Sequence, residues 1–389
     1  MSVKQMSEFS PIDFQARRQK VAASVRKSGF DAYVGTRQGA LHYLSGAFMP
    51  WRGAAIVTAN GDCQFVYWAW DTSRIKEEGV DVDITSFTFS DFTRVIAQKL
   101  EEMGIAGGRI GIDLSHPGAA QVAPGMICAS EYLELKEFLP RADIQNGVRL
   151  LDDVMLIKEQ AEIERLRLAA HVADIGFNAG RAAVHAGVTE NSVAGAIEKA
   201  IRDNGSTWAW ALTGGTEVGS GKRTGYLHGV TQQASEKLIQ DNEFVILDLH
   251  PMIDLYLADS SVPVFLGKPT SQQQGMIDCW EDVVATMIDN MRPGNPIPEV
   301  VKKGLAVFER YGQSDYCLPT FGHGLGTCAR TRPFINLRSD DVVQENMVMA
   351  LGTHLYVPEV GGMRLEFPLL VTEKGGEPLM KTPPKVHFV

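Results

Sequence analysis

The sequence predicts a two-domain protein of the α/β class, with one domain over residues 1–150 and a larger one over 151–389. Helical and strand-like segments alternate over about the first 140 residues, which is typical of a compact α/β domain. Residues 141–158 combine polar turns with a charged run and mark the boundary. Beyond it, long amphipathic helices lead into a final stretch that is mostly strand.

The first domain begins with an amphipathic helix and contains a strong hairpin signal. Phe14, Val21 and Val25 fall on one stripe of the helix, and Gly29 lies just past its end. Asn60-Gly61 between two apolar runs is typical of a tight β-turn. We expect, in order, a helix over 12–28, strands over 31–34, 53–57 and 63–67, a helix over 91–103 and a strand over 109–113.

The second domain combines longer helices with strands. Thr189 is a good N-cap, and Asn204-Gly205 ends the helix that follows it. We expect helices over 158–183, 189–204, 271–291 and 298–311, with apolar β-runs over 244–247 and 255–265.

Composition excludes several classes of function. The formal net charge is −10 and there is no long basic run, which argues against nucleic acid or an anionic membrane as a partner. Apolar runs are too short to span a bilayer, and the N-terminus lacks the apolar core of a signal peptide. The five cysteines form no CxxC pair, which predicts reduced thiols in a cytoplasmic protein.

The segment from Phe244 to Phe265 holds the most informative group of polar residues. Asp248 and His250 lie two residues apart in a strand and therefore share a face, and the next turn can bring Asp259 beside them. Two carboxylates and an imidazole in an apolar hairpin are costly unless a metal or a shared proton compensates their charge. The alternative is that both aspartates simply end strands at a turn.

Three further positions carry candidate chemistry. His228 precedes the hairpin, and His323 lies in a Gly-His-Gly segment where the backbone can approach a ligand closely. Near the C-terminus His354 lies on one strand, while Arg364 and Glu366 share a face of the next. Carboxylates and imidazoles together favour Mn, Fe, Co or Zn, and a pair of such ions would activate water.

The order of these residues resembles the creatinase/prolidase/methionine aminopeptidase family, and the resemblance spans nearly the whole chain. Asp31-Ala-Tyr-Val34, followed by His42-Tyr-Leu-Ser-Gly46, is similar to the opening of the family's N-terminal domain. The segment from Lys158 to Ala170 looks like the helix that begins its catalytic domain. The resemblance implies an α/β N-terminal domain, an α+β catalytic domain of the pita-bread fold, and a homodimer.

The resemblance also implies a site for two divalent metal ions. Such proteins bind the metals through two aspartates eleven residues apart, a histidine in a Gly-His-Gly motif and two glutamates. Asp248, Asp259, His323 and Glu366 match four of these five ligands. His228 matches a histidine that handles substrate or protons, so His228 and Glu366 are the expected catalytic residues.

Two positions depart from the family pattern. Gly352 occupies the place of the remaining glutamate, fourteen residues before Glu366. Arg330 replaces a second histidine, which in metallopeptidases helps to hold the scissile carbonyl. Ordinary prolidase or aminopeptidase activity is therefore not expected.

One interpretation of these departures is a rebuilt metal site. His354 lies two residues from Gly352 on the same strand face, so its imidazole would fill the vacancy. His250 would add a ligand beside Asp248, which resembles the lyase branch of the family.

The other interpretation is a site without metal. Pro251-Met-Ile253 matches a sequence of creatinase, where His228 would act as general acid and base with Glu366 as its partner. Creatinase lacks the aspartate pair that this chain keeps, so we favour the metal.

Four residues are candidates for binding substrate. Arg330 and Arg332 fall in the loop after His323, and we expect one of them to bind a substrate carboxylate. Tyr356 and Arg364 either contact the substrate or brace the terminal hairpin.

These observations predict a hydrolase that uses a divalent metal centre, expected to be dinuclear, to cleave a C–N bond in a small zwitterionic or carboxylate-bearing compound. Three alternatives remain. One is a metal-dependent lyase similar to the family's dimethylsulfoniopropionate lyases, another is a metal-free amidinohydrolase similar to creatinase, and the last is a non-enzymatic binding protein.

Overall fold

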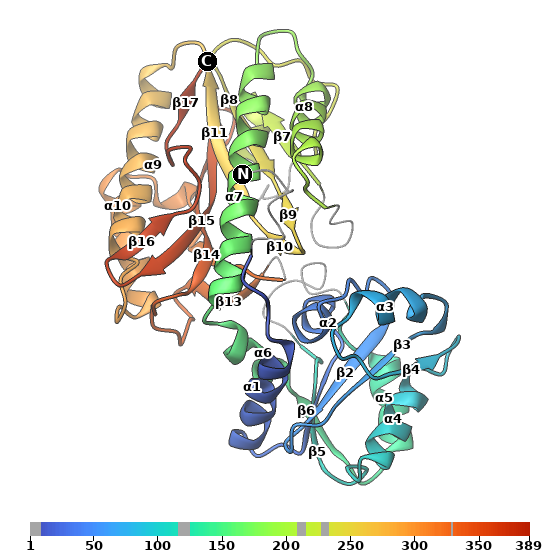
Figure 1. Ribbon diagram of the computed structural model, residues 1–389. Helices are drawn as coiled ribbons and strands as arrows, with labels where there is room; N and C mark the ends of the chain where they lie inside the picture. The colour runs from blue at the N-terminus through green and yellow to red at the C-terminus, as the bar shows by residue number, and fades with distance from the viewer. Residues whose placement is uncertain (1–8, 116–124, 208–214, 227–232, 328–329) are drawn as a thin grey trace. The chain divides into compact units, whose positions relative to one another are not determined.

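The computed structural model describes residues 9–115, 125–207, 215–226, 233–327 and 330–389 (Figure 1). The chain divides into an N-terminal unit, Pro11–Leu156, and a C-terminal unit, Ile157–Val389, which Phe9 and Ser10 also join. The predicted two-domain α/β organisation is confirmed. The expected boundary after residue 150 falls inside a helix whose Leu150 and Leu151 are buried in the core of the N-terminal unit. None of the helices described here is long and apolar enough to cross a membrane.

The N-terminal unit is a mixed six-stranded sheet with helices on both faces (Figure 1). Val21, Leu44 and Leu150 pack on one face, while Ile96 and Leu135 pack on the other. Its strand order is β4-β3-β2-β1-β5-β6. Its elements are α1 (Phe14–Lys27), β1 (Ala32–Gly35), α2 (Gln38–Ser45), β2 (Gly53–Thr58), β3 (Cys63–Trp68), η2 (Ala69–Asp71), α3 (Thr72–Glu78), β4 (Ile84–Phe87), α4 (Phe92–Glu102), β5 (Arg109–Ile112), α5 (Ala129–Phe138), β6 (Asp143–Asn146) and α6 (Val148–Met155).

The elements predicted for this unit are confirmed to within two residues at each end. In the predicted hairpin, β2 and β3 pair antiparallel, and Gly61 in their turn has a φ of 102°. Glycine is favoured there because an L side chain is strained at positive φ.

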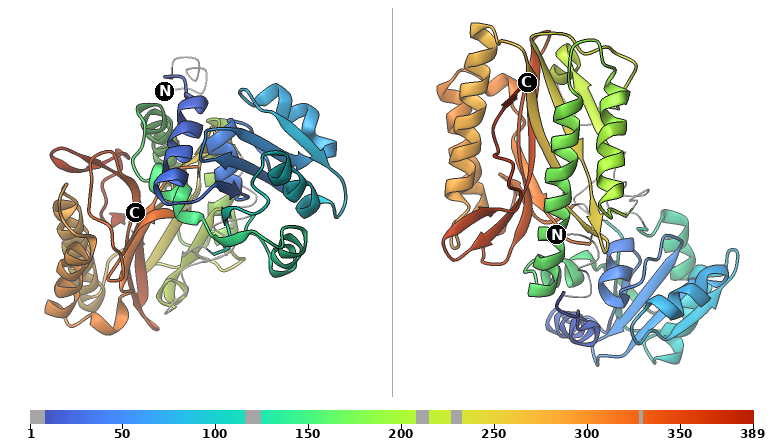
Figure 2. Two further views of the ribbon diagram at one scale, coloured as in Figure 1. Left: turned by 90° about the horizontal axis from the view of Figure 1, so that it is seen from below. Right: turned by 45° about the horizontal axis from the view of Figure 1, so that its top comes forward.

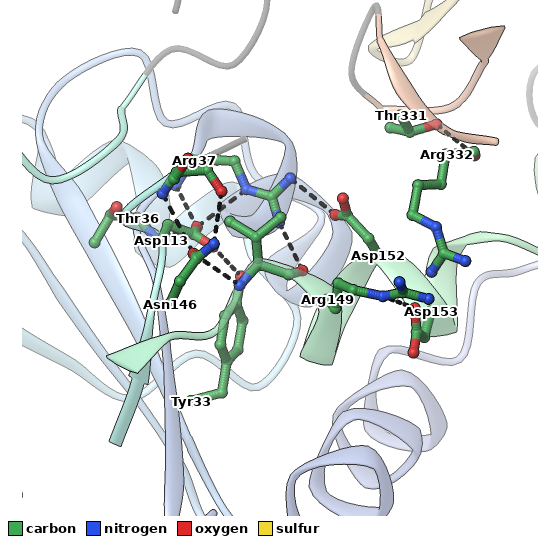
Figure 3. Close-up of polar contacts among 12 residues, drawn as sticks. Tyr33, Thr36, Arg37, Asp113, Asn146, Arg149, Asp152, Asp153, Thr331 and Arg332 are labelled. Atoms are coloured by element: carbon green, nitrogen blue, oxygen red, sulfur yellow. Dashed lines mark hydrogen bonds and ion pairs between the residues drawn. The ribbon is translucent and has the colours of Figure 1, made fainter. Parts of the chain in front are cut away.

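A buried polar network ties together the loop after β1, the end of β5 and helix α6 (Figure 3). Arg37 contacts Asp113 through Nε at 3.2 Å and Asp152 through Nη1 at 2.8 Å. The hydroxyl of Tyr33 and the backbone N–H groups of Thr36 and Arg37 donate to Asp113. Each charge has an opposite charge beside it, so the network is a structural feature of this unit.

The C-terminal unit is built on a nine-stranded sheet in which β13-β12-β14-β15-β11-β8-β7 lie side by side. Strand β16 pairs with β15, and β17 pairs with β11. Its elements are α7 (Gln160–Ala183), α8 (Glu190–Asp203), β7 (Glu217–Ser220), η4 (Gly221–Gly225), β8 (Glu243–Leu249), β9 (Met252–Ile253), β10 (Tyr256–Leu257), β11 (Ser260–Leu266), α9 (Ser271–Asn290), α10 (Ile297–Arg310), η5 (Ser314–Tyr316), β12 (Thr320–Gly324), β13 (Thr331–Asn336), β14 (Val348–Val357), β15 (Gly361–Thr372), β16 (Gly375–Pro378) and β17 (His387–Phe388).

Helices α7 to α10 run along this sheet (Figures 1 and 2), and the packing of α7 decides which side chains of β8 face away from it. In α7, a Cβ atom on Gly176 would lie 2.7 Å from the side chain of Leu249, and a Cβ atom on Gly180 would lie 3.1 Å from that of Leu247. Because side chains alternate along a strand, Asp248 projects from the opposite face. Of the polar residues predicted for the site, Asp248 therefore emerges on the face of β8 that α7 does not cover.

The β-run expected over 255–265 is interrupted, which corrects that prediction. Asp254 and Leu255 have φ values of 49° and 61°, and they form the turn of a small β9–β10 ribbon. Strand β11 then starts at Ser260 and pairs antiparallel with β8. Asp259 therefore lies at the junction between the ribbon and the sheet, rather than within a strand.

Candidate metal centre

Strand register places three carboxylates in one row across the sheet. Glu217 of β7 is opposite Asp248 of β8, which is opposite Ser261 of β11. Ser261 is opposite Glu366 of β15, which is opposite Gly352 of β14. Because directly paired residues project from the same face, the side chains of Glu217, Asp248 and Glu366 share the face opposite α7.

Four of the predicted metal ligands come together around this row. Asp248, His250, Asp259 and Glu366 are buried, and one ligand atom from each lies within 4.8 Å of the others. Nε2 of His250 is 3.2 Å from Oδ1 of Asp259 and 3.6 Å from Oδ1 of Asp248. His323 approaches Asp259 from the other side, with Nε2 3.3 Å from Oδ2.

The glycine before His323 allows β12 to approach β14 closely. Gly322 has a φ of 109°, and a Cβ atom there would lie 1.9 Å from the carbonyl oxygen of Ala350. Only glycine fits both the backbone conformation and the space. The Gly-His-Gly motif thus positions the imidazole of His323 beside Asp259.

Arg364 balances part of the negative charge. Its Nη1 lies 3.1 Å from Oε2 of Glu217 and 2.8 Å from Oδ2 of Asp248, and its Nη2 lies 2.8 Å from Oε2 of Glu366. All four residues are buried. Predicted to bind substrate or brace the hairpin, Arg364 is held in the structure by three carboxylates.

Burial and neighbouring charges change the acidity of the whole cluster. Burial raises the pKa of Asp248 to about 6 and the pKa of Glu366 to about 7, against the opposing charge of Arg364. Burial also opposes the charge on Asp259, but His250 and His323 hold the pKa of Asp259 well below its usual range. For His250 burial disfavours the proton, yet Asp248 and Asp259 outweigh it and raise the pKa to about 10.

The donor set fits a divalent metal ion. Both carboxylate oxygens of Asp248, Oδ1 of Asp259 and Nε2 of His323 are buried and, apart from ion-pair contacts, make no hydrogen bond among the described residues. Buried polar atoms of this kind are costly unless a cation or water meets them. A mixed set of carboxylates and imidazoles suits Mn, Fe, Co or Zn. Bound there, such an ion would act as a Lewis acid and lower the pKa of water.

The structure places His354 against Gly352 but outside this cluster. Its Cε1 would lie 3.1 Å from a Cβ atom on Gly352, so the imidazole occupies the space where a longer side chain would begin. Neither ring nitrogen of His354 has a hydrogen-bond partner among the residues described. His354 does not belong to the group of converging ligand atoms, although the sequence interpretation assigned it the vacancy at Gly352.

We expect His354 to make folding stability depend on pH. Burial and the charges of Arg364 and Arg330 lower the pKa of His354 to about 3. An unfolded chain protonates this imidazole near pH 6.5, so stability is lost as the pH falls from about 6.5 towards 3. Relative to His354→Gln, the unfolding free energy should fall by up to about 1.4 kcal/mol per pH unit in this window.

Urea titrations of the metal-free protein and of His354→Gln, near pH 7.5 and about pH 5, measure this change. Other titrating groups are common to both proteins and cancel in the difference. A difference between the two proteins that stays constant with pH would contradict a buried, neutral His354.

The remaining predicted substrate residues differ in their surroundings. Arg332 is buried and forms an ion pair with Asp341, so its guanidinium already has a carboxylate partner within the chain. Arg330 makes no ion pair with another described residue, and its Nε is buried without a hydrogen bond. Tyr356 is fully buried beside His354, with ring centroids 5.9 Å apart, and its hydroxyl makes no hydrogen bond among the described residues. His228 lies outside the described residues.

Glu217 is a site residue that sequence reasoning missed. It is buried at the start of β7, opposite Asp248, and forms an ion pair with Arg364. Its local signal is weak, because a glutamate opening the short segment Glu217-Val-Gly-Ser220 has no neighbour in sequence that shares its role. Only the pairing of β7 with β8 brings it to the site.

Comparison with known proteins identifies the family. Residues 164–373 match metallopeptidase family M24, and residues 17–168 match the creatinase/prolidase N-terminal domain. The Xaa-Pro dipeptidase of Pyrococcus furiosus is 25% identical over 366 residues, which cover 94% of this chain and 98% of that protein. The Xaa-Pro dipeptidase of Lactobacillus helveticus is 29% identical over 251 residues, covering 64% of this chain and 67% of that protein.

Solved structures have the same fold. A prolidase from Pyrococcus horikoshii OT3 superposes with a TM-score of 0.81 at 23% identity, covering 95% of this chain and 99% of that one. A recombinant prolidase from Thermococcus sibiricus gives a TM-score of 0.85 at 19% identity, covering 98% of this chain and all of that one. The predicted pita-bread fold and family resemblance are confirmed. The chain therefore belongs to metallopeptidase family M24, and it is a hydrolase with a creatinase/prolidase N-terminal domain.

Proposed function

We propose that this protein hydrolyses a C–N bond in small carboxylate-bearing compounds of about dipeptide size. The observation that carries the proposal is the buried convergence of Asp248, His250, Asp259 and Glu366. The relatives named Xaa-Pro dipeptidases support an amide bond as the target. The comparisons lend no support to a lyase, a metal-free amidinohydrolase or a binding protein.

Within this proposal each residue has a task. Asp248, His250, Asp259 and Glu366 would hold the divalent ion, with His323 beside Asp259. Glu366 also exchanges a proton between the attacking water and the leaving amine. His228 assists proton transfer. Arg330 binds the substrate carboxylate, because Arg332 is already paired with Asp341.

The substrate should differ from the usual Xaa-Pro dipeptide. Gly352 removes one carboxylate from the site, and Arg330 adds a cation in the loop after His323. Both changes favour a substrate with more negative charge near the scissile bond. We further propose that the protein works as a homodimer in the cytoplasm.

Chelation tests the proposal. The purified protein should release amine from at least one compound in a panel of Xaa-Pro dipeptides, N-acyl amino acids and acidic dipeptides. Removing the metal should lower the rate at least about 100-fold, and adding Mn²⁺ back should restore it, because the ion supplies several kcal/mol of transition-state stabilisation. Undiminished hydrolysis after complete chelation would contradict the proposal, and so would release of an unsaturated acid in place of the hydrolysis products.

A further inference from the structure

We infer that this chain binds one metal ion rather than two, at a position beside His250, and that Gly352 and His354 leave no second position next to it. The inference rests on the proposed function, because it concerns the same site. Three features of the described residues support it: the orientation of His250, the placement of Arg364, and the space around Gly352.

His250 is oriented as a metal ligand. Its Nδ1 lies 3.0 Å from the carbonyl oxygen of Gly215, an acceptor, so Nδ1 carries a proton and donates it. The ring is thereby turned so that Nε2 lies 3.2 Å from Oδ1 of Asp259 and 3.6 Å from Oδ1 of Asp248, where it would share a metal ion with them after giving up its proton. A hydrogen bond from the far ring nitrogen is how proteins fix the tautomer and angle of a metal-binding histidine.

The positive charge of Arg364 limits the number of metal ions that the site can hold. Its guanidinium contacts Oδ2 of Asp248 and Oε2 of Glu366, each at 2.8 Å, so one oxygen of each carboxylate faces a fixed positive charge. The other oxygen of Asp248, Oδ1, is the one that faces His250. Arg364 and one divalent ion together carry three positive charges, against the four negative charges of Glu217, Asp248, Asp259 and Glu366. A second ion would have to approach the guanidinium in a buried, low-dielectric site.

Gly352 and the neighbouring His354 offer no ligand for a second ion. Gly352 is opposite Glu366 in the sheet and has no side chain to contribute. The ring of His354 occupies the space above it, and His354 does not join the converging ligand atoms. His323 contacts Asp259, but it too stands outside the group of four. Among the described residues this group is the one set of three or more His, Cys, Asp or Glu ligands.

Metal stoichiometry of the wild-type full chain tests the inference. After saturation with Mn²⁺ and removal of excess, elemental analysis should give about one ion per chain, and the electron paramagnetic resonance spectrum should be that of isolated Mn²⁺. Two ions per chain with a spin-coupled spectrum would overturn the inference and leave the proposed function standing. A chain that stays without metal would overturn both.

Variants of His250 and His354 provide a matched comparison. His250→Ala should weaken Mn²⁺ binding at least about tenfold, since it removes one of four ligands, whereas His354→Ala should change it less than about twofold. Equal effects of the two variants would overturn the inference. Thermal unfolding of both shows that they are folded.

A variant designed to create a second metal position tests the inference independently. Gly352→Glu combined with His354→Ala restores a carboxylate opposite Glu366 and clears the ring that blocks it. We expect this double variant to take up about two Mn²⁺ ions per chain. If the folded double variant still binds one Mn²⁺ ion per chain, Gly352 and His354 do not determine the number of ions. That result would overturn this part of the inference.

Discussion

Replacing Asp259 with asparagine is expected to lower kcat/KM at least about 1000-fold, which corresponds to about 4 kcal/mol of transition-state stabilisation. Asp259 is the residue that joins the two histidines, since its oxygens lie 3.2 Å from Nε2 of His250 and 3.3 Å from Nε2 of His323. Asparagine keeps the shape but removes the charge and adds an N–H donor. Metal content should fall together with activity, while circular dichroism should show a folded protein.

Asp254→Asn is the matched control for this prediction. Asp254 lies in the turn of the β9–β10 ribbon, five residues before Asp259, and pairs with Arg165 at 2.7 Å. The chemical change is the same, but it falls outside the cluster. Activity within about twofold of wild type is expected, because a partly exposed ion pair contributes little. Comparable losses in both variants, or more than a tenth of the activity left in Asp259→Asn, would contradict the assignment.

Arg364→Met is expected to reduce the free energy of unfolding by about 3–5 kcal/mol in the metal-free protein. Arg364 lies within 3.1 Å of Glu217, Asp248 and Glu366, and all of them are buried. Its loss leaves three carboxylates without their cation, which is costlier than the loss of a favourable pair. Urea unfolding monitored by fluorescence gives the change directly.

Two comparisons isolate the cause of that loss. Arg167→Met removes a pair with Glu377 in which both side chains are 45% exposed, and it should cost less than about 1 kcal/mol. Adding Glu217→Gln to Arg364→Met should recover part of the stability, because one uncompensated charge disappears. If the double variant is no more stable than Arg364→Met, charge compensation is not the reason for the loss.

Local signals in the sequence are enough to predict most of the elements. The Asn60-Gly61 turn, the N-cap at Thr189 and the apolar stripes of α1 and α7 each act within a few residues. The interruption before β11 escapes prediction because it depends on positive φ at Asp254 and Leu255, two residue types that do not demand it.

The site is predictable where its residues follow motifs and unpredictable where they depend on strand register. The spacing of Asp248, His250 and Asp259 along the chain is enough to predict a shared pocket. Glu217 reaches the site only through the pairing of β7 with β8, and the partner of Arg332 is Asp341, across a loop. Ion pairs between residues on separate elements cannot be predicted from the residues that neighbour them in the sequence.

His354 shows the same limit in a single residue. Its position two residues from Gly352 predicts a replacement ligand, and the alternation of β14 does place it on the site face. The direction of the imidazole, however, depends on the space that Gly352 leaves open. The ring fills that space instead of joining the group of Asp248, His250, Asp259 and Glu366.

Diffraction from crystals grown with Mn²⁺, recorded at a wavelength where manganese scatters anomalously, tests the central claim most directly. We expect an anomalous peak enclosed by Asp248, His250, Asp259 and Glu366, with no comparable peak beside Gly352. A peak at any other place, or an ordered protein with no peak at these four residues, would contradict the claim.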